Sequence, residues 1–158
     1  MWLPPPDHTP ALPNLRESVT VWAPELWVGK MSQHIMIPID PGTWILQNHR
    51  LHPQAKAKKV KALRNKAGWL ARQNLEPVIG PAAIFARAYV KSGVLPDADA
   101  IAPMVKAAID GLVDARILPD DSGEYVHLIG YGRPARDRTL KPRMRALQLV
   151  ITDQYVPF

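Results

Sequence analysis

Two pairs of aspartates in this 158-residue sequence have the residue type and spacing that could do chemistry. Asp97 and Asp99 form an Asp-x-Asp pair, and Asp120 and Asp121 are adjacent further along the chain. If the pairs converge, their carboxylates repel one another, and Mg²⁺ or Mn²⁺ relieves that repulsion because both ions prefer hard oxygen ligands. An ion held in this way activates water and stabilises the leaving oxygen in phosphodiester hydrolysis.

Each pair also has a purely structural interpretation. Asp97 and Asp99 precede a predicted helix, where aspartate is a favoured N-cap and suits the positive end of the helix dipole. Asp120 and Asp121 adjoin Ser122-Gly123, a combination that is typical of a turn. Neither pair is specific by itself, so both interpretations stand at this point.

Convergence of the two pairs depends on the helix predicted between them, at residues 100–115. A helix of that length is about 24 Å long at ~1.5 Å per residue. The pairs meet only if residues 116–120 run back along the helix, and such a return spans at most ~17 Å. The return is geometrically marginal, and spacing alone leaves convergence open.

Periodic apolar residues predict the elements that must position the aspartates. Pro38 places the first strand at a sheet edge or ends it, because proline cannot donate to a strand ladder. The order β-α-β-α-β-β predicts an α/β (α+β) fold, a mixed β-sheet flanked by two main helices. The predicted strands are residues 34–39, 82–90, 124–130 and 143–152, and the predicted helices are residues 54–73 and 100–115.

Proline marks the predicted domain boundary. Many of the 17 prolines fall near the N-terminus, where fixed φ angles and missing amide donors disfavour helices and inner strands. Residues 1–30 are therefore expected to be a Pro-rich extension, and residues 31–158 the functional domain.

Composition narrows the class of protein. The formal charge of +6 favours a polyanionic partner such as nucleic acid, and the absence of cysteine excludes disulfides, thiolate metal sites and a cysteine nucleophile. No apolar run approaches the ~20 residues that span a bilayer, and no secretory signal is recognisable. A cytoplasmic protein is expected, which for a phage protein means the host cytoplasm.

The segment from Asp97 to Asp121 resembles the core motif of the RusA-like Holliday junction resolvases, especially phage-borne ones. That family shows Asp-x-Asp, an apolar helix ending near Asp-Gly, and then an Asp-Asp pair followed by a strand. The segment Asn48-His-Arg-Leu-His52, before a basic helix, resembles the family's N-terminal signature. The resemblance covers residues ~34 to 152, although only the 25 residues from Asp97 to Asp121 are closely diagnostic.

The resemblance implies a homodimeric, Mg²⁺-dependent endodeoxyribonuclease that cuts four-way DNA junctions by paired nicks. It assigns the catalytic and metal-binding carboxylates to Asp97, Asp99 and Asp121, with Asp120 as a secondary metal ligand. Two positions depart from the family pattern. Pro103 stands where a catalytic lysine is common, with Lys106 as its nearest substitute, and Ala100 stands where asparagine is common.

Basic residues form two candidate DNA-binding surfaces, although a solvated lysine face is the alternative. Arg50 is expected near the scissile phosphate, and His52 is expected either to contact DNA or to have no functional role. Trp69 is interpreted as a core side chain rather than a base-stacking wedge. The first surface comprises Lys56, Lys58, Lys59, Lys61, Arg64, Lys66 and Arg72, and the second Arg133, Arg136, Arg138, Lys141, Arg143 and Arg145.

Three functions therefore stay open. The leading one is a structure-selective endonuclease that resolves branched DNA in recombination and repair. The second is a catalytically weak or inactive accessory protein that binds junction DNA. The third is a basic interaction module in which the aspartates only cap helices and form turns.

Overall fold

The computed structural model describes residues 32–153, so the predicted extension at residues 1–30 lies outside the described residues. Its elements, in chain order, are β1 (Ser32–Ile39), α1 (Pro53–Asn74), β2 (Ala82–Val90), the 3-10 turn η3 (Asp99–Ile101), α2 (Ala102–Asp114), β3 (Val126–Tyr131), β4 (Ala135–Arg136) and β5 (Arg145–Thr152).

The described strands form one mixed sheet in the order β1-β5-β2-β3, with β4 also paired to β2. β5 runs antiparallel to both β1 and β2, whereas β3 and β4 run parallel to β2. Pro38 lies on β1 at the sheet edge, as predicted, where its missing amide proton costs no ladder bond to an outer neighbour. The mixed sheet with two main helices confirms the predicted α+β fold.

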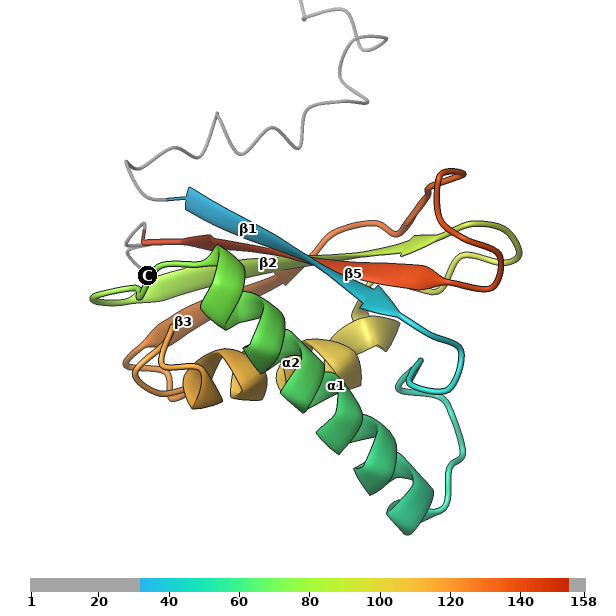
Figure 1. The fold of residues 1–158 in the computed structure, drawn as a ribbon, viewed down its shortest axis with the longest axis horizontal. Coiled ribbons are helices and arrows are strands. Elements are labelled where there is room, and N and C mark those ends of the chain that lie inside the picture. Colours follow the sequence, from blue (N-terminus) through green and yellow to red (C-terminus); the bar gives the residue numbers. More distant parts are fainter. Residues whose placement is uncertain (1–31, 154–158) are drawn as a thin grey trace, which may run out of the picture.

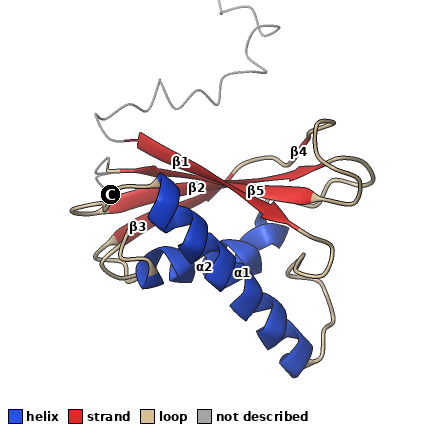
Figure 2. Cartoon of the chain, in the orientation of Figure 1, coloured by secondary structure: helices blue, strands red, loops and turns tan. Residues whose placement is uncertain are grey.

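Both helices pack on the same face of the sheet (Figure 1), and Figure 2 shows α1 crossing over α2 on that side. Alternation along the strands explains why, because every second side chain of a strand points to one face. The residues that this alternation buries include Ile35, Ile37 and Ile39 of β1, Ala86, Ala88 and Val90 of β2, and Leu147, Leu149 and Ile151 of β5.

The two helices approach closely because each has a glycine at the crossing. A Cβ atom on Gly111 of α2 would lie 2.4 Å from the carbonyl oxygen of Arg64, and one on Gly68 of α1 would lie 2.9 Å from that of Gly111. Beside the crossing, the Arg64 guanidinium donates to both carboxylate oxygens of Asp114, at 2.5 and 2.7 Å. Packing of α1 at this crossing determines which side of α2 faces the solvent.

The structure differs from the predicted elements in several places. β1 begins at Ser32 rather than His34, and β5 begins at Arg145 rather than Arg143. The second helix begins with the 3-10 turn η3, β3 begins at Val126 rather than Glu124, and the predicted basic loop contains β4. Trp69 was predicted to lie in the core, which is wrong, since 58% of its surface is exposed. The buried side of α1 comprises Leu63, Ala67, Gly68 and Ala71, and Trp69 lies on the opposite side of the helix.

Neither helix within residues 32–153 has the length and apolar character needed to cross a bilayer.

Candidate active site

The Asp97-x-Asp99 pair lies at the turn that leads into α2. The Ala100 amide donates to the Asp97 carbonyl oxygen at 3.2 Å, and both aspartate side chains are exposed. The N-cap residues of η3 and α2 are Ala98 and Ile101, and neither makes a side-chain capping bond. Neither aspartate is therefore an N-cap, but Asp99 lies in the first turn of η3, where an acidic residue suits the helix dipole, and both aspartates are exposed.

The loop before α1 lies against this turn. The Gln47 amide donates to the Ala100 carbonyl oxygen at 2.8 Å, which places the loop containing Arg50 beside the Asp-x-Asp pair. His52 is the N-cap of α1, where its Nδ1 accepts from the Gln54 amide at 3.4 Å. The two segments that carry the family resemblance are thus neighbours in space, although they are far apart in the sequence.

The chain reverses direction sharply after α2. The amides of Arg116 and Ile117 donate to the carbonyl oxygens of Val113 and Leu112, both at 2.9 Å. Arg116 has a φ of 60°, so the helix ends in a Schellman motif with arginine at the left-handed position that usually holds glycine. Ile117 and Leu118 are then buried, which directs the chain back along α2.

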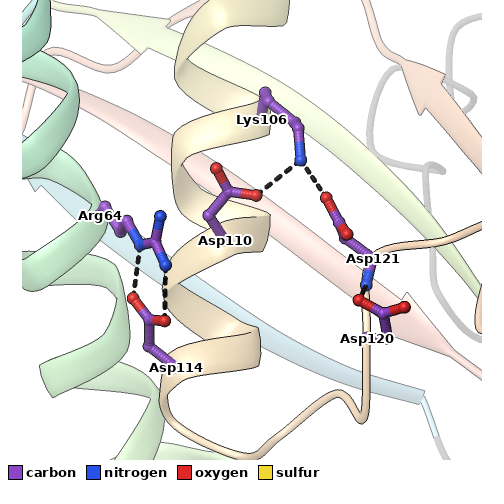
Figure 3. A network of polar contacts seen from close by, with 6 residues as sticks. All are labelled: Arg64, Lys106, Asp110, Asp114, Asp120 and Asp121. Carbon is purple, nitrogen blue, oxygen red and sulfur yellow. Dashed lines mark hydrogen bonds and ion pairs between the residues drawn. The ribbon is translucent and has the colours of Figure 1, made fainter.

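This reversal brings Asp121 onto the solvent side of α2 (Figure 3), where its carboxylate contacts the ammonium of Lys106. The same ammonium donates to Asp110, one helical turn further along α2, at 2.6 Å. We call Lys106, Asp110 and Asp121 the lysine–aspartate cluster. Lys106 lies eight residues before the end of α2, a distance of about 12 Å that the returning segment can cover.

Asp120 and Asp121 have different roles in this arrangement. The Asp120 carboxylate accepts from the Asp121 amide at 2.9 Å and so stabilises the local turn. The Asp121 carboxylate is directed to Lys106 instead. The turn interpretation therefore applies to Asp120, and Asp121 is the member of the pair whose side chain reaches α2.

Charge within the cluster favours the ionised forms of its members. Hydrogen bonding and attraction from the Lys106 ammonium lower the pKa of the Asp121 carboxyl below its ordinary value. Asp110 and then Asp121, in turn, raise the pKa of Lys106. The ion pair between Lys106 and Asp121 thus favours the charged form of each partner.

The expected gathering of three or four carboxylates is not found. Among residues 32–153, no group of three or more histidine or acidic side chains lies close enough together to hold a metal ion. Asp121 pairs with Lys106, and Asp97 and Asp99 stay exposed at the start of the helix. The carboxylates have the donor chemistry that Mg²⁺ prefers, but the side chains as they lie do not form a complete ligand set.

Asp110 is the member of the cluster that sequence reasoning missed. It lies four residues after Lys106 on a helix, and a lysine and an aspartate at that spacing share one face. That spacing is visible in the sequence and was the signal that could have found it.

The predicted DNA-binding residues are mostly exposed, including Lys56, Lys58 and Lys61 of α1 and, in the basic segment after β3, Arg133, Arg136 and Arg138. Lys59 is half-buried. Arg64 differs from the others because its guanidinium is occupied by Asp114, and this ion pair raises the pKa of Arg64. The structure thus gives Arg64 a role in joining α1 to α2.

No protein-family model matches the sequence, and a search of curated proteins finds no significant match.

Proposed function

We propose that this chain is an Mg²⁺-dependent endodeoxyribonuclease that cuts branched DNA, such as Holliday junctions, in recombination and repair. The observation that carries the proposal is the return of Asp121 to the solvent side of α2, beside Lys106. Asp97 and Asp99 are exposed at the start of the same helical segment. The acidic residues that the family resemblance assigns to catalysis therefore lie before α2 and on the segment that returns beside it.

The DNA would be held by the basic residues that surround this helix. α1 contains seven lysine and arginine residues and no acidic residue, so its exposed side suits a phosphate backbone. Arg50 would contact a phosphate near Asp99, which is supported by the hydrogen bond that joins its loop to Ala100. Such contacts give affinity that is independent of sequence, as a structure-selective nuclease needs.

The proposed cofactor is Mg²⁺, with Mn²⁺ as a substitute, and the proposed ligands are Asp97, Asp99 and Asp121, with Asp120 secondary. When bound, the ion would supply an activated water and stabilise the leaving oxygen. To bind the ion, Asp121, which is exposed, would have to turn its carboxylate away from Lys106 and toward Asp97 and Asp99. Lys106 would then be free to stabilise negative charge on the phosphate, the role proposed for it in catalysis.

The proposed enzyme acts in the cytoplasm and works as a homodimer. A four-way junction offers two phosphates related by two-fold symmetry, and a two-fold symmetric dimer addresses both together.

A second function, a junction-binding protein with little or no nuclease activity, is favoured by two observations. Two carboxylates neutralise Lys106, and Pro103 occupies the first turn of α2 where the family commonly has lysine. This protein would keep the basic surfaces and bind branched DNA without cutting it.

Incubation of a labelled synthetic four-way junction with Mg²⁺ separates these functions, using the wild type and Asp99→Asn. Cutting by the wild type and intact junction with Asp99→Asn support the nuclease. Tight binding without cutting by either protein supports the accessory function, and neither activity would leave only a basic interaction module.

A further inference from the structure

Trp69 is exposed on the outer side of α1, where a large aromatic side chain has no structural role within residues 32–153. Its surface is 58% exposed, whereas Trp44 is 6% exposed and packs in the core. The buried side of α1 lies about half a turn away around the helix axis. Burial within this fold therefore does not explain a tryptophan at this position.

The neighbours of Trp69 on the helix surface are basic. Lys66 lies three residues before it and Arg72 three residues after it, and residues at that spacing are adjacent on a helix. One nitrogen of the Arg72 guanidinium donates to the carbonyl oxygen of Asp114 at 3.3 Å, which holds that charge beside the C-terminal end of α2. Because α1 has no acidic residue, this surface repels cations and attracts a polyanion.

An aromatic side chain between cations fits one polyanion better than others. Phosphate oxygens pair with lysine and arginine, and an unpaired base stacks on the face of an aromatic ring. A duplex contacted only through its backbone offers no exposed base face to Trp69. A polyanionic partner without bases would leave the tryptophan without a function.

We propose that the outer side of α1 binds an unpaired DNA base, with Trp69 stacking on the base while Lys66 and Arg72 contact the adjoining phosphates. This inference rests on the proposed action on branched DNA and identifies the part of that DNA which α1 contacts. A base that unpairs at a branch point exposes its face for stacking, so such bases are the proposed occupants. Trp69 would then position the junction and would take no part in the chemistry.

The test measures binding in EDTA, so that it does not depend on cleavage. Fluorescence anisotropy would give the Kd for a labelled oligothymidylate of about 20 nucleotides and for a duplex of the same length. The variants are Trp69→Ala, Trp69→Phe and, as a matched control, Asn65→Ala. Asn65 is exposed and lies one turn before Trp69 on the same side of α1.

Trp69→Ala is expected to weaken binding of the single strand by roughly tenfold or more and to change duplex binding by less than about twofold. Trp69→Phe should restore most of the single-strand affinity, because phenylalanine keeps an aromatic face. Asn65→Ala should bind both probes like the wild type. Thermal melts of each variant would verify that the fold is unchanged.

Several results would overturn the inference. The first is undetectable single-strand binding by the wild type, and the second is a single-strand affinity of Trp69→Ala equal to that of the wild type. The third is an equal loss of affinity for the single strand and the duplex in Trp69→Ala. A change of oligomeric state in Trp69→Ala with unchanged DNA affinity would instead identify a protein interface. If Trp69→Ala loses single-strand affinity but the wild type does not cut junctions, this inference stands and the nuclease is rejected. If the wild type cuts junctions but Trp69→Ala binds the single strand normally, the nuclease stands and this inference is rejected.

Discussion

At the scale of single residues, the account depends on Lys106 and its two carboxylate partners. The ammonium lies between Asp110 and Asp121 and holds the end of the returning segment against α2. It also lowers the pKa of the Asp121 carboxyl, which favours the ionised form of that group. An ionised carboxylate is the form that binds a divalent ion.

Replacing Lys106 with methionine should move the titration of Asp121. Since Lys106 lowers the pKa of Asp121, that pKa is expected to be higher in the variant than in the wild type. On acidification, Asp121 of the variant would therefore be protonated first. NMR titration of the side-chain carboxyl carbons would measure both proteins. Asp137, whose pKa is lowered by Thr139 instead, provides the internal control and should titrate identically in both. An unchanged Asp121 midpoint would show that the ion pair does not persist in solution.

Arg116 offers a test of the chain reversal. It adopts a φ of 60°, which costs an ordinary residue about 1 kcal/mol and costs glycine almost nothing. Arg116→Gly is therefore expected to raise the free energy of unfolding by roughly 1 kcal/mol. Urea denaturation would measure the change, and a destabilised variant would argue against the Schellman motif.

At the scale of helices and strands, the crossing of α1 over α2 positions the cluster. Glycine inside a helix normally costs about 1 kcal/mol relative to alanine, so Gly111→Ala would be stabilising in an isolated helix. Here the added Cβ would lie 2.4 Å from the Arg64 carbonyl oxygen, and the helices must separate. We expect a loss of about 1–3 kcal/mol in the free energy of unfolding.

Gly123→Ala is the matched control for that substitution, because a Cβ atom there meets nothing within 4 Å. Chemical denaturation of both variants should show a large loss for Gly111→Ala and a small change for Gly123→Ala. Equal effects would mean that the helix crossing is looser than described.

The strands and helices could be predicted from the sequence because their apolar residues follow the periods of two and 3.6 residues. The geometry of the aspartates could not. The return of Asp121 depends on a left-handed arginine at position 116, and arginine gives no sequence signal for that conformation. Trp69 was misplaced for a different reason, since it was assigned to the face near Leu70, whereas the buried side of α1 comprises Leu63, Ala67, Gly68 and Ala71.

At the scale of the whole molecule, the described residues share one buried core. The buried cluster extends from Ile35 to Ile151 and includes both helices and the central strands.

A chain that begins at Met31 is accordingly expected to fold and to retain its activity on DNA. Thermal denaturation and junction cutting would be compared with those of the full chain. An insoluble or inactive product would show that residues 1–30 belong to the functional domain.

The net positive charge of the molecule is consistent with DNA as the partner proposed for the candidate site. A formal charge of +6 would draw the proposed DNA substrate toward the protein, although acidic residues at the proposed site would repel it. Neutralising Asp97 or Asp121 should therefore leave DNA binding intact or strengthen it, even where cutting is lost.

The most direct test of the central claim is the rate of nicking of a synthetic four-way junction in Mg²⁺ by the wild type, Asp121→Asn and Asp153→Asn. Asp153 is an exposed aspartate after β5 and serves as the matched control. We predict that the wild type and Asp153→Asn cut the junction, that EDTA stops both, and that Asp121→Asn binds it without cutting. Equal cutting by Asp121→Asn, or no Mg²⁺-dependent cutting by the wild type, would contradict the account.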